Sequence, residues 1–404
     1  MLKQLWYRLH LPPGIITGRY WHHSPSPVIR QHWQALWNPT VRQSRLLSWL
    51  LVLMQLVAWW TYFGWLAYRQ VVKKLDIWQH IIDLPTRSQQ RRDLWYATFR
   101  YGIPPTDYFA YQLYRYPRQQ WLDFIYDHEV PKWQNSLSGK VSADQQRWIS
   151  DKAYFAQRSL QNGIPAILTL RFIPRGKKLT AVQVFQQRSL FFKPTVANRS
   201  DGCMALEYQA ASDTYCLIAE KEEQGIKQRE VILSQLNQQF EQREYIVQPL
   251  LENSLAMRQL CQTDRMTTLR IISAYQHSEV QIISAILEVP RADNRCFYRL
   301  IAIDINSGET VQRLLGQHLQ PLNETQEQWR QQLANQPIPA WQSIVTVVQR
   351  AHRLCNDYAT IGWDVAVTTE GVKLVEGNVG WGVKNHQYEK PIFALLKSHP
   401  YNHF

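Results

Sequence analysis

The distribution of hydrophobic and polar residues divides the chain into three parts. The first part, residues 1–75, contains an apolar run at 46–68 that no charged residue interrupts. In residues 76–150, apolar and aromatic residues recur at helical spacing, which predicts a helical accessory domain. From 151 to 404, short apolar segments alternate with helical patterns. This last part is therefore expected to be an α+β domain with mostly antiparallel sheet.

Within the third part, individual elements can be assigned from their periodicity. Residues 151–162 predict a helix, which the Gly-Ile-Pro sequence at 163–165 ends before a strand. Further helices are expected around 226–243 and over 341–358. Strands are expected in the apolar segments 189–194, 203–209, 215–220, 245–251, 267–275, 280–289 and 299–309.

The net charge of +13 is concentrated at the start of the chain. Residues 1–75 hold nine Lys or Arg and no acidic residue, because the first one is Asp76. Removing these nine from the 45 basic residues leaves 36, against 32 acidic residues. The leader therefore indicates contact with an anionic surface. It has no recognised nucleic-acid-binding motif, and no nucleic-acid partner is expected.

The apolar run at 46–68 has the length of a membrane segment. Its 23 residues would form a helix roughly 34 Å long, against roughly 30 Å of hydrocarbon. Trp and Tyr residues within it suit membrane interfaces. Basic residues flank both ends, so the positive-inside rule assigns no orientation. Three alternatives stay open: a spanning helix, a helix on one face of the membrane, and a helix buried in a soluble domain.

The five cysteines suggest no chemistry of their own. They are scattered and form no Cys-x-x-Cys pair, and no histidine cluster has zinc spacing. Small buried thiols in a reducing compartment are the expected reading. The chain also contains no recognisable Ser/His/Asp set for nucleophilic catalysis.

The stretch WDVAVTTEGVKLVEGNVGWG, residues 363–382, predicts two strands around a turn. If residues 369–371 form a three-residue turn with Gly371 at a positive φ, Asp364 faces Glu376. Directly opposed side chains lie about 4.5–5.5 Å apart at Cβ, where like charges are destabilising. The pairing therefore needs a compensating positive charge.

A divalent cation would supply that charge. Asn378 lies two residues beyond Glu376 and shares its face, so two carboxylates and an amide oxygen converge. Mg²⁺ suits a site with few carboxylates completed by phosphates and waters. The opposite face, with Trp363, Val365, Val367 and Val375, would pack on a core. The alternative is a solvated hairpin in which the two acids never meet.

The run IGWDVAV…VKLVEGN resembles the metal-binding end of the ATP-grasp fold, and most closely the branch related to glutamate ligases and associated with sugar transfer. In that family an acid is followed about a dozen residues later by Glu, and two residues later by Asn. The steps here are 12 and 2. The likeness covers roughly 150–390. It implies two α+β subdomains that grip a nucleotide, preceded here by a helical, membrane-associated N-terminal region.

The resemblance implies roles for individual residues. Asp364, Glu376 and Asn378 would hold Mg²⁺ against the phosphates of ATP. DKAYFAQRSLQNGIP is similar to the segment that opens the ATP-grasp domain, which makes Lys152 a phosphate contact. LFFKP is similar to the second lysine strand, which makes Lys193 a nucleotide-binding and catalytic residue.

Three further segments fall in the family's order. YIVQPLLEN looks like the hinge strand that meets adenine, with Gln248 and Leu250 at the base and Glu252 or Asn253 near the ribose. MTTLRIIS is similar to a segment whose arginine approaches the phosphates or the substrate, here the catalytic candidate Arg270. The loop after the second lysine would cover the phosphates. It has one glycine, Gly202, and a candidate phosphate contact, Arg199.

The resemblance implies an ATP- and Mg²⁺-dependent ligase that joins a carboxylate to an amine through an acyl phosphate, in cell-envelope or exopolysaccharide biosynthesis. One or two Mg²⁺ ions are expected, with Mn²⁺ as a substitute. His386 and Gln387 are candidates to line the acceptor site.

The use of ATP predicts a location on the cytoplasmic face of the inner membrane, with residues 46–68 in contact with the bilayer. The alternative is a degenerate, non-catalytic nucleotide-binding membrane adaptor of a glycan-assembly system, which the glycine-poor loop and the basic leader favour.

Overall fold

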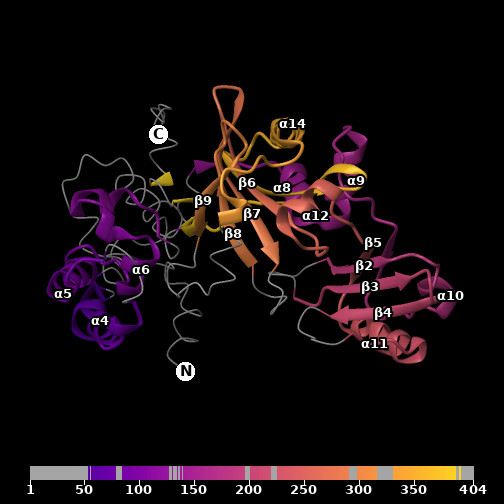
Figure 1. The fold of residues 1–404 in the computed structure, drawn as a ribbon, viewed down its shortest axis with the longest axis horizontal. Helices are drawn as coiled ribbons and strands as arrows, with labels where there is room; N and C mark the ends of the chain where they lie inside the picture. The colour runs from indigo at the N-terminus through magenta and orange to yellow at the C-terminus, as the bar shows by residue number, and fades with distance from the viewer. Residues whose placement is uncertain are drawn as a thin grey trace.

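The protein consists of a helical region and two β-sheets that lie side by side (Figure 1). The computed structural model describes residues 53–54, 56–78, 84–126, 130, 134, 137–138, 140–195, 201–219, 225–290, 298–315, 331–387 and 391–392. In Figure 1 the helices α4 to α6 lie on one side, a six-stranded sheet is in the middle and a five-stranded sheet lies on the other side. Most of the basic leader, residues 1–52 and 55, lies outside the described residues.

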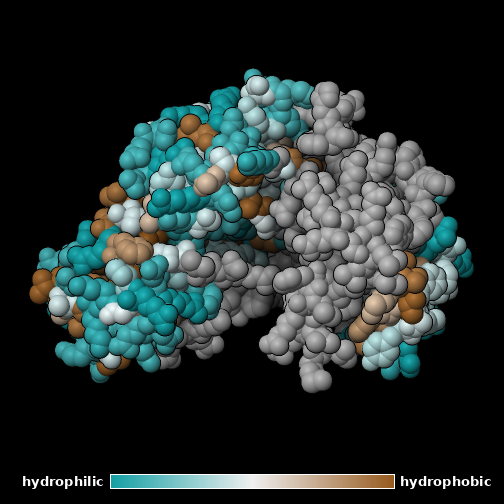
Figure 2. Space-filling model, turned by 180° about the vertical axis from the view of Figure 1, so that it is seen from behind, coloured by the Kyte–Doolittle hydropathy of each residue, from teal (hydrophilic) through white to brown (hydrophobic). Residues whose placement is uncertain are grey.

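The helical region begins before residue 76, at Trp59, and its elements end at Asp123. Its elements are η2 (Trp59–Phe63), α4 (Gly64–Val72), η3 (Leu75–Trp78), α5 (Arg87–Trp95), η4 (Tyr96–Arg100), α6 (Pro105–Ala110), η5 (Leu113–Arg115) and η6 (Arg118–Asp123). Aromatic side chains fill its core. Seen from behind in Figure 2, apolar side chains also reach the surface where α4 lies. Within the described residues, no helix is both long and apolar enough to cross a bilayer.

The five-stranded sheet has the order β1-β5-β2-β3-β4, and every neighbouring pair is antiparallel. Its strands are β1 (Arg171–Ile173), β2 (Leu190–Pro194), β3 (Met204–Gln209), β4 (Thr214–Ala219) and β5 (Tyr245–Pro249). Helices α10 (Ala181–Val184) and α11 (Arg229–Gln242) share its hydrophobic core through Val184, Ile232, Leu236 and Phe240. This packing leaves the other face available to the second sheet.

The six-stranded sheet has the order β11-β10-β6-β7-β8-β9 and is also antiparallel throughout. Its strands are β6 (Thr268–Gln276), β7 (Glu279–Pro290), β8 (Tyr298–Ile303), β9 (Thr310–Leu315), β10 (Thr360–Thr368) and β11 (Gly371–Asn378). Helices α8 (Ala143–Ser150), α9 (Lys152–Gln161), α12 (Leu255–Cys261) and α14 (Trp341–Arg353) contribute side chains to the core on one face. The sequence did not predict β9. Trp148 is fully buried in this core, so α8 packs with the α+β domain.

The strand expected directly after Pro165 begins later than predicted. Helix α9 ends at Gln161, and Gly163 adopts a positive φ of 68° in the turn that follows, which is consistent with the predicted stop. Ala166 then forms only an isolated bridge with Leu374 before β1 starts at Arg171. This short extended segment crosses from one sheet to the other, so it cannot pair as a continuous strand.

The predicted hairpin forms, but its register differs from the prediction near the turn. Gly371 has the expected positive φ of 97°, yet it pairs with Thr368 instead of belonging to the turn. Next to the turn, Thr368 therefore pairs with Gly371, one residue before its predicted partner Val372. A β-bulge between Asp364 and Val365 then restores the predicted pairing of Asp364 with Glu376.

The bulge also corrects the predicted core face. Val365 pairs with Leu374, and it is Leu374 that enters the buried cluster, whereas Val375 is only half-buried and outside it. Because side chains alternate with a period of two, one extra residue exchanges the two faces of β11. Because of the bulge, Leu374 faces the hydrophobic core, whereas Glu376, two residues later, faces the opposite side together with Asp364.

The helical region is fastened to the chain segment that follows β11. Gln387 Nε2 donates to Ile125 O at 2.7 Å, and its Oε1 accepts from Ile125 N at 3.1 Å. Gln134 Nε2 donates to Trp381 O at 2.9 Å. Ile125, Trp381 and neighbouring apolar side chains form a shared buried cluster. The candidate acceptor residue Gln387 therefore has a structural role.

Gly377, between Glu376 and Asn378, provides a test of this packing. A Cβ at Gly377 would lie 2.8 Å from the Trp363 ring and 3.0 Å from Ile149 Cδ1. We expect Gly377→Ala to lower the free energy of unfolding by about 1–3 kcal/mol, because overpacking displaces buried groups. Urea titration measures the change. Gly380→Ala is the matched control, since a Cβ there meets nothing within 4 Å; an equal loss in both variants would contradict the packing argument.

Candidate functional site

The site is built on a row of charged residues that crosses three strands of the six-stranded sheet. Asp364 on β10 pairs with Arg270 on β6 at one side and with Glu376 on β11 at the other. Asn378 shares the face of Glu376, and its Nδ2 donates to Glu376 Oε1 at 3.2 Å. The structure therefore brings together the three predicted metal ligands and the predicted catalytic arginine.

Each carboxylate in this row has a basic partner. Arg270 Nε lies 2.6 Å from Asp364 Oδ1. Lys193 on β2 forms a short ion pair with Glu376, so its ammonium group reaches from the five-stranded sheet to the six-stranded one. Both pairs are largely buried, since the four side chains are 11–26% exposed. The two sheets thus meet through opposite charges.

Lys152 joins this cluster from the first turn of α9. Its Nζ donates to Pro194 O at 3.4 Å, directly after Lys193 in the chain. Asp151 caps the helix, because its Oδ1 accepts from Ala153 N at 3.1 Å and from Tyr154 N at 3.0 Å. The position of Lys152 is therefore set by where α9 begins.

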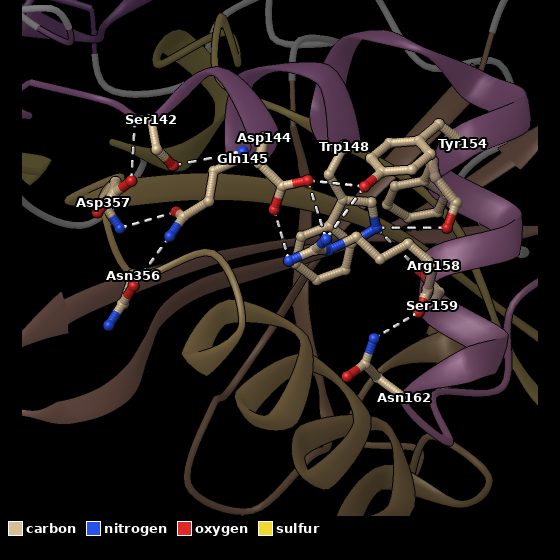
Figure 3. A network of polar contacts seen from close by, with 11 residues as sticks. Ser142, Asp144, Gln145, Trp148, Tyr154, Arg158, Ser159, Asn162, Asn356 and Asp357 are labelled. Atoms are coloured by element: carbon tan, nitrogen blue, oxygen red, sulfur yellow. Dashed lines mark hydrogen bonds and ion pairs between the residues drawn. The ribbon is translucent and has the colours of Figure 1, made fainter.

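A polar network fixes α9 against its neighbours (Figure 3). Asp144 on α8 binds Arg158 on α9 through both carboxylate oxygens, at 2.9 and 2.7 Å, and accepts from Tyr154 OH at 2.7 Å. Gln145 exchanges hydrogen bonds with Asn356 and Asp357 beyond α14. These contacts hold α8, α9 and the loop after α14 as one unit, which anchors the base of Lys152.

The charges shift one another's protonation. Glu376 is buried, which raises its pKa, but Lys193, Lys152 and the Asn378 amide outweigh burial and lower it to about 2. Burial, together with Glu376 and Glu288, raises the pKa of Asp364 well above its usual range despite Arg270. Burial and the adjacent Lys193 lower the pKa of Lys152. The cluster therefore has one firmly ionised carboxylate, Glu376, and one whose ionisation burial and neighbouring acids oppose despite its arginine, Asp364.

This arrangement fits a divalent cation. Among the residues that the structure describes, the buried Asp364 Oδ1 lies 2.6 Å from Arg270 Nε without hydrogen-bond geometry, and the pKa of Asp364 stays raised beside this arginine. A cation beside it would favour the ionised form of Asp364 and relieve its repulsion with Glu376. No three His, Cys, Asp or Glu side chains gather at a metal site in the described part of the chain. A cation held by Asp364, Glu376 and Asn378 would thus need further ligands, which phosphate oxygens and waters supply for Mg²⁺.

The predicted adenine and ribose contacts lie at the end of β5. Gln248 is buried, and its Nε2 donates to Ile167 O at 3.5 Å. The Leu250 N–H donates to Ser189 O at 3.2 Å, so in this structure that amide already has an acceptor. Glu252 is exposed, and its carbonyl accepts from Thr369 N at 3.1 Å. This backbone contact ties the hinge to the turn of the candidate metal hairpin.

Asn253, the alternative ribose contact, is structural. Its side chain is fully buried, donates to Arg265 O at 2.7 Å and accepts from both Thr267 N and Thr267 Oγ1 at 3.0 Å. These bonds use one N–H of the amide and its oxygen, and the side chain is fully buried, so Asn253 supports the loop that leads into β6.

Gly202 lies beside the site at the end of the predicted covering loop. It has a positive φ of 80°, and its carbonyl accepts from Tyr245 OH at 3.1 Å. A Cβ at Gly202 would lie 3.2 Å from that hydroxyl oxygen. The positive φ and the close Tyr245 hydroxyl are sufficient reasons for a glycine at this position, whether or not a phosphate binds there. Residues 196–200, including Arg199, lie outside the described residues.

Two nearby groups were not assigned from the sequence. Glu288 on β7 faces Thr268, whose Oγ1 donates to it at 3.2 Å, and its charge influences Arg270 and Asp364. Ser284, four residues earlier, forms a 2.8 Å hydrogen bond with the buried His386. The hairpin of β6 and β7, with a bulge between Ile272 and Ser273, brings these residues to the site, and the sequence pattern did not mark that bulge.

Comparisons with known proteins were made for both sequence and structure. Residues 137–397 match the family described as sugar-transfer associated ATP-grasp. No curated protein matches the sequence.

Similar solved structures include D-alanyl-alanine synthetase A from Vibrio cholerae, with 12% identity and a TM-score of 0.37 over 65% of this chain and 63% of that chain. N5-carboxyaminoimidazole ribonucleotide synthetase in its ADP complex has 11% identity and a TM-score of 0.36 over 67% and 56%. The ATP-grasp ligase PsnB with minimal precursor, Mg and ADP has 12% identity and a TM-score of 0.35 over 67% and 66%. The chain thus spans less than two thirds of the length of each of these proteins.

The lowered pKa of Glu376 predicts how stability changes with pH. In the folded protein it is about 2, against an ordinary value of 4.5. The ionised carboxylate therefore stabilises the fold fully above pH about 4.5, and this contribution disappears as the pH falls towards about 2. We expect Glu376→Gln to be less stable than wild type by about 1–3 kcal/mol at pH 7, with the difference shrinking in that acidic window.

Urea unfolding of both proteins between pH 3 and pH 7 measures this difference, as far into acid as wild type stays folded. Glu370→Gln is the control, because Glu370 forms an ion pair with Lys373 on the same hairpin but is 68% exposed. Its removal should cost less than about 1 kcal/mol. A stability difference for Glu376→Gln that stays constant from pH 7 to pH 3 would refute the assignment.

Proposed function

We propose that this chain, which belongs to the sugar-transfer associated ATP-grasp family, is an ATP- and Mg²⁺-dependent ligase that joins a carboxylate to an amine. The observation that carries the proposal is the meeting of Lys193 from one sheet with Glu376 and Asp364 from the other. A nucleotide triphosphate with a divalent cation has the charge pattern that these groups complement, because phosphates attract the lysines and the cation attracts the carboxylates.

The residues divide into three roles in this reaction. Lys152 and Lys193 neutralise phosphate oxygens. Asp364, Glu376 and Asn378 would hold Mg²⁺, which when bound would supply positive charge against the negative charge of the phosphates. Arg270 turns its Nε to Asp364 and remains 24% exposed on its side chain, so the rest of its guanidinium can face the transferred phosphoryl group or the acyl substrate.

The reaction proceeds in two steps. First, an oxygen of the substrate carboxylate attacks the γ-phosphorus of ATP, the bond to ADP breaks, and an acyl phosphate forms. The amine then attacks the acyl carbon, an amide forms, and phosphate leaves while the nitrogen loses a proton. Positioning and charge neutralisation are the main demands of phosphoryl transfer, and the fixed charges of two packed sheets meet them.

Nucleotide binding would exchange the ion pair that closes the site. In the structure Lys193 and Glu376 neutralise each other. If a phosphate and a cation enter together, Lys193 would pair with the phosphate and Glu376 would help to hold the cation. Neither charge is left buried and unpaired, which would be costly. Nucleotide without cation would leave Glu376 facing phosphate, so we expect binding to depend strongly on Mg²⁺.

The family description supports a setting in glycan or cell-envelope synthesis. We place the reaction at the cytoplasmic face of the cell membrane, because ATP is available there and the leader is basic. The acyl donor would be an amino acid or a uronic acid, since both offer a carboxylate for activation. This setting is a proposal that rests on the ligase reaction.

A nucleotide-binding adaptor without turnover is the second candidate. The observation that favours it is the Leu250 N–H, which the resemblance assigns to adenine and which here donates to Ser189 O. Adenine would have to replace that bond. The two candidates share nucleotide binding and differ in product formation, so two experiments separate them.

Isothermal titration with a non-hydrolysable ATP analogue, with and without Mg²⁺, tests nucleotide binding. We expect binding with Mg²⁺, and a loss of at least about 100-fold in Asp364→Asn and Glu376→Gln, because each removes a cation ligand. Glu207→Gln on the exposed part of β3 is the control and should bind like wild type. If neither nucleotide nor Mg²⁺ binds to wild type, both candidate functions are wrong.

Hydroxylamine tests the acyl phosphate. It is a small neutral nucleophile that captures acyl phosphates as hydroxamates, so it replaces the unknown amine. We expect ADP and hydroxamate to form in equal amounts with one member of a panel of amino acids and uronic acids, and not with Lys193→Met. Mg²⁺-dependent nucleotide binding without hydroxamate from any panel member would favour the adaptor.

A further inference from the structure

The helix at the start of the described chain presents an unusually apolar surface. Trp60, Phe63, Trp65 and Leu66 are each 45% exposed, and Tyr62 is 62% exposed. Leu53, Met54 and Val57, one to two turns earlier, are 52–65% exposed. Figure 2 shows brown surface beside teal at the lower right, where α4 and α5 lie in this view. A contiguous apolar patch of this kind marks an interaction surface. We call these eight residues the aromatic face.

The opposite side of this helix is attached to the helical region. Trp59 Nε1 donates to Thr98 O at 2.8 Å, and Gly64 lies so close that a Cβ would be 3.3 Å from Phe99. Val71 is buried in the aromatic core. The helix therefore lies along the surface of the domain. A spanning orientation would carry η4 and its neighbours into the hydrocarbon, including α5 with its arginines.

Positive charge lies beside the C-terminal end of the aromatic face. Arg69, Lys73 and Lys74 follow it on α4 and the turn after it, and all three are exposed. Helix α5, which packs against the same helix, adds exposed Arg87, Arg91 and Arg92. Asp76 pairs with Arg87 and offsets its charge, and Asp93 is buried against Arg118, so Arg69, Lys73, Lys74, Arg91 and Arg92 leave a net positive charge. An anionic surface is therefore the complementary partner.

We propose that the aromatic face lies in the interfacial layer of an anionic lipid bilayer, with the helix parallel to the membrane plane. Indole and phenol rings have an apolar body and a polar tip, which suits the headgroup region. Lysines and arginines at the rim contact lipid phosphates. One-sided contact places both basic flanks on the same side of the membrane, which removes the orientation problem of a spanning segment.

Contact with the membrane would also set how the ATP-grasp domain lies relative to the bilayer, because the two parts of the chain are packed together. The helical region that carries the aromatic face also holds Gln387 and Trp381, in the segment after the metal hairpin. Membrane contact would therefore hold the segment that follows the candidate metal ligand Asn378 at a set distance from the bilayer. A substrate anchored in the same bilayer is the kind of molecule that this geometry serves.

Vesicle flotation of the full chain tests the proposal. We expect binding to phosphatidylglycerol-containing vesicles, weaker binding to phosphatidylcholine alone, and loss of binding as salt rises. Tyr62→Asp and the double variant Trp60→Ser, Trp65→Ser should each reduce binding to anionic vesicles at least about tenfold, because they remove apolar contact with the bilayer. Val182→Asp is the control, since Val182 is 81% exposed on α10, far along the chain from the aromatic face.

Vesicle binding by wild type alone does not identify the aromatic face as its cause, because residues 46–52 are also apolar. The comparison between variants of the aromatic face and the control therefore decides the outcome. Tyr62 contacts Phe63 through its ring and is otherwise the most exposed aromatic of the face, so its variant should fold normally even if the Trp variant does not. If Tyr62→Asp binds anionic vesicles as well as Val182→Asp does, the proposal is overturned. Self-association that Tyr62→Asp abolishes, without vesicle binding by wild type, would instead identify a second copy as the occupant. Neither result depends on ligase activity.

Discussion

Two carboxylates share a largely buried face of one sheet, and the rest of the site is arranged to make that possible. Asp364 and Glu376 pair directly across β10 and β11, where their repulsion opposes folding. Arg270 from β6 forms an ion pair with Asp364, and Lys193 from the other sheet forms one with Glu376. The compensation is uneven, because the pKa of Glu376 is lowered and that of Asp364 is raised. The remaining deficit of positive charge is what makes the pair suitable for a cation.

The Lys193–Glu376 pair also links architecture to function. It joins a sheet whose far side is covered by α10 and α11 to a sheet whose far side is covered by α8, α9, α12 and α14. Each half has its own hydrophobic core, so the two can be positioned by polar contacts between them. Such contacts exchange partners readily when a nucleotide and a cation arrive. A hydrophobic junction would have no comparable reason to respond to either ligand.

The helical region is connected to the site through the segment that follows β11. Its aromatic core is independent of both sheets, yet Gln387 and a shared apolar cluster fasten it to the segment that follows Asn378. One side of the assembly thus has an apolar, basic surface, and another has a charged cluster suited to nucleotide. The physical connection between them is short and well packed. Location at a membrane and chemistry on an envelope precursor would then be properties of one rigid arrangement.

The sequence by itself determined the antiparallel α+β domain, the helices around 226–243 and 341–358, and the spacing of Asp364, Glu376 and Asn378, because periodicity and short-range spacing are local properties. It also placed Gly371 at a positive φ, although Gly371 pairs with Thr368 directly after the turn and is not part of it. Tertiary structure decided the rest. The bulge beside Asp364 exists because Leu374 must enter the core while Glu376 must face the site, and only packing imposes both demands. Glu288, Ser284 and the meeting of Lys193 with Glu376 depend on register and on sheet docking. These are set by contacts between residues far apart in the chain, for which the one-dimensional pattern holds no local signal.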